Sequence, residues 1–202
     1  GADVDQVRRA VGADRRIGPG FMSPGLGFGG PGLTRDVRAI RAVAAEKGYR
    51  IELLDGVERV NARQRTLIVE KMTAHFGSLA GRTIAVWGLA FKPKTDDVRE
   101  APAMAVVEAL VAAGARVRAY DPEAMKAAQA VVGDGVTLVR RAYDALVGAD
   151  ALALLTEWNE FRRPDFAKMR TLMQAPVVFD GRNIYNRDQM KADGFTYYGI
   201  GR

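Results

Sequence analysis

Two basic side chains, Lys92 and Arg99, flank a loop that leads into a predicted helix near Ala101. Their charges stand close to the positive N-terminal end of that helix, an arrangement suited to hold a phosphate group. A solvated loop explains the same residues equally well, because neighbouring carboxylates can neutralise both bases. These carboxylates are Asp96, Asp97 and Glu100.

Three other charged residues are candidates for contact with a ligand. Arg182 follows the apolar run VVFD, and Arg16 stands where a glycine- and proline-rich segment begins. Taken singly, each of these arginines is also typical of an exposed surface. Asp36 follows the same segment, and its carboxylate suits the start of a helix, where it would stabilise free N–H groups and the helix dipole. An isolated aspartate there is more typical of a helix cap than of a catalytic group.

The segment RIGPGFMSPGLGFGGPGLTRD, residues 16–36, is the most informative part of the chain. Between Gly18 and Gly32, seven of fifteen residues are glycine and three are proline. The interior of a helix or strand does not hold that density, because glycine loses backbone entropy there and proline lacks a donor. A flexible linker is the alternative, but linkers are rich in serine and charge. The apolar side chains in this segment are Phe21, Met22, Leu26 and Phe28. They favour a shaped loop whose bare backbone lies against a ligand.

The composition excludes several kinds of site. The 202 residues suffice for one large domain, and no cysteine is present, which excludes disulfides, thiolate zinc sites and a thiol nucleophile. The single histidine, His75, excludes most imidazole metal sites. The net charge of +6 is scattered rather than clustered, which argues against nucleic acid as a partner. There is no apolar run of about 18 residues and no signal-peptide pattern, so we expect a cytoplasmic protein without a metal or membrane partner.

The opening residues show an amphipathic helical pattern, with Val4, Val7 and Val11 on one face. The pattern is typical of the middle of a helix, and we therefore expect the sequence to be a fragment.

Residues 37–77 also show helical periodicity. A first apolar stripe ends at Gly48, and a longer one of about six turns ends at Gly77. Asn61 and Gln64 interrupt the apolar seam of the longer helix. Such a helix is typical of a long helix that connects domains or subunits. It is equally typical of an ordinary core helix with two partly exposed polar residues.

Residues 81–202 alternate strand and helix signals. β-prone runs are expected at Thr83–Leu89, Arg116–Tyr120, Val136–Val139, Ala151–Thr156, Val177–Asp180 and Phe195–Ile200, with helices near 101–113, 122–131, 141–148, 164–173 and 187–192. Strands separated by helices build βαβ units, so we predict a parallel, doubly wound sheet. The predicted fold is α/β, with a helical region over residues 1–80 and a Rossmann-like domain over residues 81–202.

Such sheets bind ligands at the carboxyl ends of their strands. This rule places the motifs WGLAFKPKTDDVREAP, YDP, TEWNEF and FDGRN along one edge. The first strand is followed by GLAFKP and not by the pyrophosphate-binding pattern G-x-G-x-x-G. The sheet is therefore not predicted to be an ordinary dinucleotide domain.

The ordered motifs together resemble the C-terminal half of the UDP-glucose 6-dehydrogenases, within the wider family of UDP-glucose and GDP-mannose dehydrogenases. The resemblance covers essentially the whole chain and rests on RIGPGFMSPGLGFGG, DVRAI, VERVNARQ, WGLAFKPKTDDVREAP, AYDP, TEWNEF and FDGRNIY. It implies NAD as cofactor, UDP-glucose as substrate, and two oxidations at the sugar C6 through a cysteine-bound intermediate. It also implies a homodimer, assembled through the helical region of residues 1–80.

The resemblance further implies roles for individual residues. The implied UDP-sugar contacts are Arg16, Phe21, Met22, Ser23, Pro24, Gly25, Gly29, Lys92 and Arg182. Arg16 would reach the substrate of a neighbouring subunit. Arg35 and Arg99 stand where the family contacts NAD, and Asp36 stands where an aspartate helps to activate water or the nucleophile.

Two departures limit what the resemblance implies. The family's catalytic turn reads GGSCFPKD, whereas this chain reads GGPGLTRD, so Gly32 occupies the nucleophile position and Arg35 replaces a lysine. The family's N-terminal NAD-binding domain, with an assisting lysine and asparagine, is also missing from this sequence. We therefore expect a chain that binds the nucleotide sugar but does not complete its oxidation. The alternative is a degenerate homologue that serves as a non-catalytic nucleotide-sugar-binding and dimerisation module.

Overall fold

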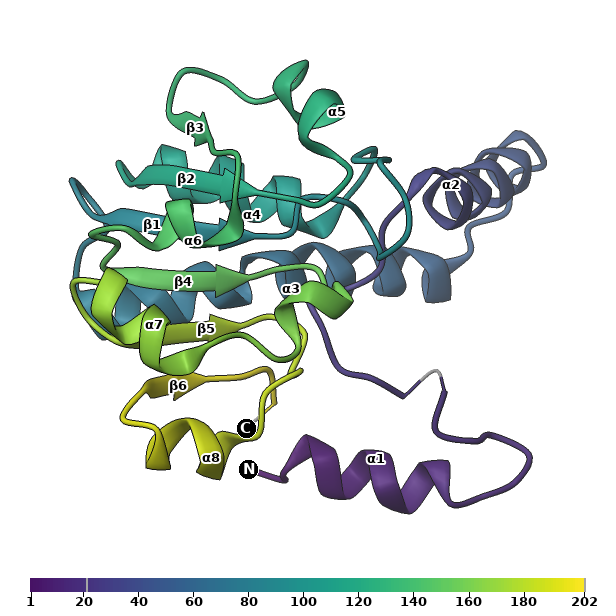
Figure 1. Ribbon diagram of the computed structural model, residues 1–202. Coiled ribbons are helices and arrows are strands. Elements are labelled where there is room, and N and C mark those ends of the chain that lie inside the picture. The colour runs from purple at the N-terminus through teal and green to yellow at the C-terminus, as the bar shows by residue number, and fades with distance from the viewer. Residues whose placement is uncertain (21, 202) are drawn as a thin grey trace.

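Six parallel strands form one sheet in the computed structural model, which describes residues 1–20 and 22–201. The strands are β1 (Thr83–Trp87), β2 (Arg116–Tyr120), β3 (Val136–Leu138), β4 (Ala151–Leu154), β5 (Val177–Asp180) and β6 (Thr196–Tyr198). They lie in the order β3-β2-β1-β4-β5-β6, so the chain reverses direction across the sheet between β1 and β4 (Figure 1). The predicted doubly wound parallel sheet is confirmed.

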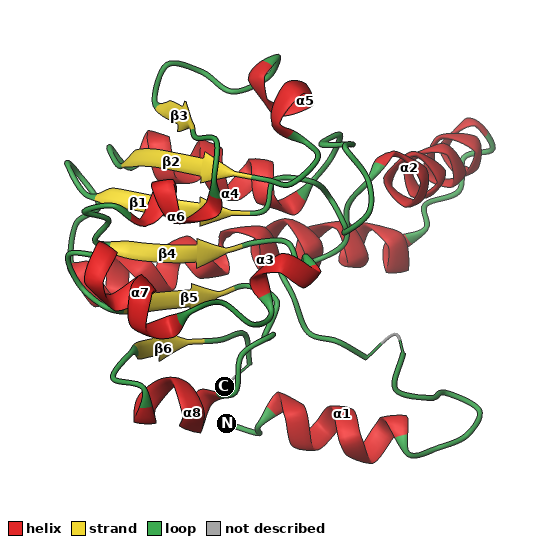
Figure 2. Ribbon diagram, viewed as in Figure 1, coloured by secondary structure: helices red, strands yellow, loops and turns green. Residues whose placement is uncertain are grey.

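Helices cover both faces of this sheet. They are α4 (Pro102–Ala112), α5 (Met125–Gln129), α6 (Ala142–Leu146), α7 (Phe166–Leu172) and α8 (Arg187–Ala192), with a 3₁₀ turn at Asn159–Phe161. Figure 2 shows α6 and α7 in front of the strands and α4 behind them. Each of these helices falls within its predicted range.

The centre of the sheet is buried. β1, β4 and β5 are buried along their whole length, as parallel strands covered on both faces require. Trp87 at the end of β1 is 1% exposed, stacks on Phe161 with ring centroids 5.0 Å apart, and donates from Nε1 to the carbonyl of Ala142 at 2.7 Å. Its predicted place in the core is confirmed.

Helix α1 (Val4–Gly12) lies apart from the sheet, next to the C-terminal residues (Figure 1). Asp3 caps it, since its carboxylate accepts from the N–H groups of Asp5 and Gln6. The helix therefore begins at Val4 with a cap. The apolar pattern of Val4, Val7 and Val11, which suggested the middle of a helix, lies in the structure at a helix start. The amide of Val4 also donates to the carbonyl of Gly201 at 3.1 Å, which ties this helix to the other end of the described chain.

Helix α2 (Pro31–Glu46) begins earlier than predicted. Residues 31–36 were expected to belong to the glycine- and proline-rich loop, but they form the first turns of this helix. Proline is well tolerated at the first helical position, because its ring presets φ and its missing N–H has no partner there. Gly30, with φ of 86°, makes the turn into the helix. The part of the segment that remains a loop, residues 18–30, is called the Gly/Pro loop below.

Helix α3 (Glu52–Phe76) runs for 25 residues and ends at Gly77, as predicted. Figure 1 shows it passing behind the sheet and extending toward α2. The turn between α2 and α3 is tied by arginines, because Arg41 pairs with Asp55 and Glu58, and Arg50 pairs with Asp55 at 2.7 Å. The hydrogen bond from Arg50, and to a smaller extent the one from Arg41, lowers the pKa of the Asp55 carboxyl. His75 lies in the last turn, as expected, and its Nδ1 is 2.9 Å from the hydroxyl of Tyr198.

Candidate functional site

The Gly/Pro loop passes along the carboxyl edge of the sheet, where parallel sheets bind ligands. Leu26 anchors it there and is completely buried. A Cβ placed on Gly181, just after β5, would lie 2.8 Å from Cδ1 of Leu26, and a Cβ on Gly25 would lie 2.9 Å from Nη1 of Arg182. A side chain at either glycine would displace a neighbour. The Gly/Pro loop and the turn after β5 can therefore lie this close only because both positions are glycine.

Arg182 is fixed at this contact. Its Nη2 donates to one carboxylate oxygen of Glu157 at 2.8 Å and its Nε lies 2.7 Å from the other, an ion pair in which each side chain is less than a quarter exposed. The main-chain amide of Arg182 donates to the buried Asp180 at 2.9 Å. Asp180 also accepts from the amide of Tyr185, so the turn that carries Arg182 is held from both ends. The expectation that Arg182 reaches the carboxyl edge of the sheet is confirmed.

The other end of the Gly/Pro loop packs on the segment after β1. A Cβ on Gly29 would lie 2.2 Å from the carbonyl oxygen of Glu100, and one on Gly30 would lie 2.6 Å from the ring of Phe91. Glu100 itself has a positive φ of 54°, a conformation rare for a residue with a side chain. Lys92 is exposed and its Nζ lies 5.2 Å from the centre of the Phe91 ring. Lys92 therefore lies at the exposed surface of the loop that contacts Gly29 and Gly30.

A buried carboxylate braces the segment that leads to Lys92. Asp121, at the end of β2, is fully buried and accepts from the amides of Leu89 and Ala90 at 2.7 and 3.0 Å. It also accepts from Nε1 of Trp158 at 3.0 Å. One carboxylate thereby joins the turns that follow β1, β2 and β4. Its other oxygen accepts from the amides of Glu123 and Ala124.

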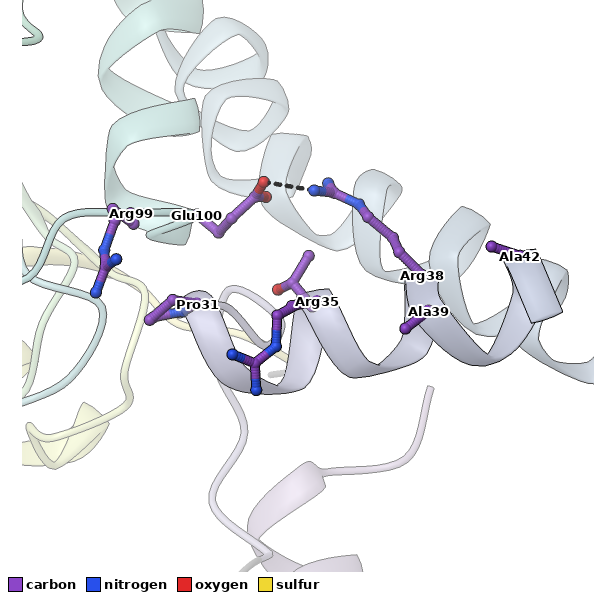
Figure 3. A pocket seen from close by; sticks show the side chains of 8 residues that line it. Pro31, Arg35, Arg38, Ala39, Ala42, Arg99 and Glu100 are labelled. Carbon is purple, nitrogen blue, oxygen red and sulfur yellow. Dashed lines mark hydrogen bonds and ion pairs between the residues drawn. The ribbon is translucent and has the colours of Figure 1, made fainter.

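An open pocket of 790 Å³ lies between α2 and the segment before α4 (Figure 3). Arg35 and Arg99, the two residues expected to contact NAD, both line it. Arg38, which sequence reasoning did not single out, lines it as well, one helical turn beyond Arg35. Its lining residues are Pro31, Thr34, Arg35, Arg38, Ala39, Ala42, Arg99 and Glu100. Two guanidinium groups on α2 and a third on the facing segment suit an anionic ligand.

Each arginine of this pocket has a carboxylate partner. Arg99 pairs with Asp97 at 2.7 Å, Arg38 with Glu100 at 2.8 Å, and Arg35 with Asp36 at 3.0 Å. The hydrogen bond to Asp97 raises the pKa of Arg99, and the bond to Glu100 raises that of Arg38.

The expected pairing of the loop carboxylates with Lys92 and Arg99 is therefore correct for Asp97 and wrong for Glu100. Glu100 turns toward α2 because Arg38 projects from that helix into the pocket (Figure 3).

Position 32, which the family resemblance predicts as the nucleophile position, has open space around it. Gly32 is the second residue of α2, and in the described part of the chain a Cβ added there would meet no atom within 4 Å. Asp36 does not cap the helix, which corrects the sequence-based interpretation. It lies in the second turn with its side chain 60% exposed, because Gly30 and Pro31 start the helix upstream.

The remaining predicted contacts lie before Gly25. Met22 and Pro24 are half-buried and Ser23 is exposed, while Phe21 lies outside the described residues. Arg16 is 88% exposed and pairs with Asp14, and this hydrogen bond raises the pKa of Arg16. Within one chain, Arg16 is thus held beside α1 by its neighbour and is not brought to the residues at the sheet edge.

Two further findings concern residues 1–20 and 22–201. In this part of the chain no three acidic or histidine side chains gather in a way that would hold a metal ion. None of its helices combines the length and the apolar character needed to cross a bilayer.

Two models of one family match the chain. The UDP-binding domain of the UDP-glucose/GDP-mannose dehydrogenase family matches residues 85–187, and the central domain of that family matches residues 1–63. The first match runs from within β1 to the start of α8 and so includes β2 to β5, and the second spans α1, the Gly/Pro loop, α2 and half of α3.

Individual relatives agree with these matches. The UDP-glucose 6-dehydrogenase of Pseudomonas aeruginosa is 48% identical, over the whole chain and 46% of that protein. A Bacillus subtilis UDP-glucose 6-dehydrogenase is 43% identical over the whole chain and 44% of its length. The solved structure of a UDP-glucose dehydrogenase from Pyrobaculum islandicum superposes with a TM-score of 0.86 at 35% identity, over the whole chain and 44% of that structure. The chain spans less than half the length of the relatives it matches.

Proposed function

Because this chain belongs to the UDP-glucose/GDP-mannose dehydrogenase family, we propose that it binds UDP-glucose as the C-terminal part of an NAD-dependent UDP-glucose 6-dehydrogenase. The packing of the Gly/Pro loop carries this proposal. Leu26 fastens bare backbone to the carboxyl edge of the sheet, between Arg182 on one side and the Lys92 segment on the other. Backbone amides with two cations beside them are suited to a diphosphate and a sugar.

The proposed cofactor fits the pocket on α2. NAD carries a pyrophosphate, and Arg35 and Arg38 on α2 and Arg99 on the facing segment are donors of matching charge that line the pocket. When bound, NAD would accept a hydride from the sugar C6. The roles of Arg35 and Arg99 in cofactor binding, and of Asp36 in activating water, remain part of the proposal.

The chain as given is proposed not to complete the oxidation. The cysteine-bound intermediate of the family needs a thiolate, and this sequence has no cysteine and carries glycine at position 32. The lack of a side chain at Gly32 supports the alternative of a non-catalytic nucleotide-sugar-binding module. Restoring Gly32→Cys in a longer chain that includes the relatives' N-terminal domain separates the two. Recovered NADH production favours an impaired enzyme, and none favours the module.

Calorimetric titration of the 202-residue chain with UDP-glucose tests the proposed binding. We expect a submillimolar Kd that rises at least about tenfold in Lys92→Ala and Arg182→Ala, since each loses a charged hydrogen bond to the ligand. Lys168→Ala is the matched control, because Lys168 is an exposed cation on α7 that lies over the ring of Tyr143. A folded chain without measurable binding contradicts the proposal, as does steady NADH production by the chain alone.

We also propose a homodimer built on α2 and α3. Large apolar side chains are exposed on these two helices, among them Ile40 (55%), Val43 (58%), Leu53 (77%) and Val60 (56%). Leu53 and Val60 line an open apolar groove of 600 Å³ on α3. A second copy of the same surface would cover this groove, as two-fold interfaces do. Sedimentation should show a dimer that Val60→Asp converts to monomer, whereas a monomeric wild-type chain contradicts the interface.

A further inference from the structure

Three polar side chains of α3 hold the main chain of the Gly/Pro loop. Asn61 forms a pair of bonds with one loop residue, since its Oδ1 accepts from the amide of Phe28 at 2.8 Å and its Nδ2 donates to the carbonyl of Phe28 at 3.0 Å. Gln64 donates to the carbonyl of Gly25 at 2.7 Å. Arg65 donates to the same Phe28 carbonyl at 3.0 Å. These are the polar residues that interrupt the apolar seam of the helix, together with their neighbour.

The loop and the helix fit each other at Asn61. This side chain is buried, with 8% of its surface exposed, and both ends of its amide are used by the loop. A buried amide without such partners would be costly, so its bonds define one position of the loop. Gly27 lies against it with φ of +92°, and a Cβ on Gly27 would be 2.2 Å from Oδ1 of Asn61. The amide therefore occupies the space that a side chain at position 27 would need.

The same loop residues face the sheet on their other side. Gly25 contacts Arg182, and Gly29 contacts the carbonyl of Glu100. Arg65 links the two sides, because its guanidinium lies 3.8 Å from the Glu100 carboxylate while it donates to the loop. The Gly/Pro loop is thus a layer held between α3 and the residues proposed to bind the nucleotide sugar.

We propose that Asn61, with Gln64 and Arg65, positions the Gly/Pro loop for the nucleotide sugar. The proposal rests on the proposed UDP-glucose site and adds residues that bond to the main chain of the loop and are not among the proposed ligand contacts. A loop so rich in glycine has many backbone conformations when free, and ligand affinity is reduced by the cost of selecting one of them. Side chains of α3 that fix Phe28 and Gly25 before the ligand arrives remove that cost. They are positioning residues and not catalytic residues.

The test compares Asn61→Leu with the unaltered 202-residue chain. Leucine is similar in size to asparagine but leaves the amide of Phe28 without a partner. Loss of two hydrogen bonds, each worth roughly a fivefold change in an equilibrium constant, should raise the Kd for UDP-glucose by at least about tenfold. Thr66→Ala is the matched control, because Thr66 is an exposed polar residue of α3 whose bonds go to Arg63 and Glu70 of the same helix.

Amide hydrogen exchange, followed by NMR, gives a second readout that a purely structural role would not move. In Asn61→Leu without ligand, exchange should accelerate at Phe28 and not at Ile84 and Val86 in the centre of the sheet. Faster exchange throughout the chain would instead show general destabilisation and would contradict a positioning role. Should Asn61→Leu not fold, Gln64→Ala removes one bond to Gly25 and should still raise the Kd severalfold.

The outcomes separate this inference from the proposed function. If the unaltered chain binds UDP-glucose and Asn61→Leu binds within twofold of it, the inference is wrong and the site stands. If the unaltered chain does not bind, the site is wrong, and the inference falls with it as a statement about the nucleotide sugar. Exchange at Phe28 then decides alone whether α3 orders the loop.

Discussion

Restoring a thiol with Gly32→Cys should create an acidified cysteine at an open helix start. Position 32 is the second residue of α2, and a Cβ there meets no described atom within 4 Å. The substitution should therefore leave the free energy of unfolding within about 0.5 kcal/mol of the original value. Because the sequence has no cysteine, the new thiol is the only one in the chain.

The size of the pKa shift follows from the surroundings of the thiolate. The first turn of α2, described in full, contains no acidic residue, so its N-terminus can stabilise a negative charge by about 0.3–1 kcal/mol. Arg35 and Asp36, three and four residues along the helix, carry opposite charges and pair with each other, so their effects on the thiolate largely cancel. At about 1.36 kcal/mol per pKa unit, the helix terminus lowers the thiol pKa by roughly 0.2–0.7 units from about 8.5. Near pH 7 the thiolate fraction then rises from roughly 3% to roughly 9% for a pKa of about 8.0.

The rate of alkylation by iodoacetamide, measured by mass spectrometry from about pH 5 to 10, gives this pKa directly. Ala39→Cys is the matched control, since Ala39 lines the same pocket but lies two turns further into α2. It keeps the charge of Arg35 as an i,i+4 neighbour and loses the helix terminus. The thiol at position 32 should titrate about 0.2–0.7 units lower than this control.

An equal or higher pKa at position 32 than at position 39 would refute the reasoning. It would mean that the amides of the first turn are not free to face the thiolate, and that the helix does not start at Pro31 in solution. The restored thiol would then lack the activation that a nucleophile in this place needs.

Three other perturbations follow from the same structure. Asp121→Ala should lower the free energy of unfolding by about 3 kcal/mol in urea titration, because buried donors after β1, β2 and β4 lose their acceptor, while Asp121→Asn keeps an acceptor and should lose less. Glu157→Gln should remove the ionic partner that fixes the position of Arg182 and so weaken UDP-glucose binding severalfold in calorimetry. The thermal midpoint should stay close to that of the original chain. Hydrogen bonds from Arg50 and a second arginine lower the pKa of Asp55, so its contribution to stability is present above the ordinary aspartate pKa and is lost as the pH falls through the lowered value. The melting temperatures of the chain and of Asp55→Asn should therefore differ near pH 7 and converge toward about pH 2.

The sheet was predictable because each strand is a local signal. Runs such as Ala151–Thr156 are apolar and short, and only their last residues leave the strand to form turns at the carboxyl edge. The start of α2 was not predicted, since proline and glycine at 31 and 32 suit a loop and a first helical turn equally. The helix is selected over the loop by the turn at Gly30, where the main chain packs on the ring of Phe91.

Part of the candidate site was predictable from the family resemblance. Arg35 and Arg99 were named from it, and the structure brings them to one pocket. Arg38 was missed, because an arginine on a helix face looks like any surface residue until Arg99 is placed opposite. The partner of Asn61 was hidden for another reason. Phe28 is 33 residues away in a loop without periodicity, so no pattern links the two.

Ligand binding and chemistry depend on different parts of the Gly/Pro segment. From Gly25 to Gly30 nearly every main-chain position is fixed by contacts to α3 or to the sheet, so a substitution such as Gly27→Ala would collide with Asn61. Two residues further on, Gly32 has open space around it. The nucleophile proposed for that position could therefore be absent without disturbing the loop, because no packing contact depends on a side chain there. This independence is the physical reason to expect nucleotide-sugar binding to persist in a chain that has no thiol.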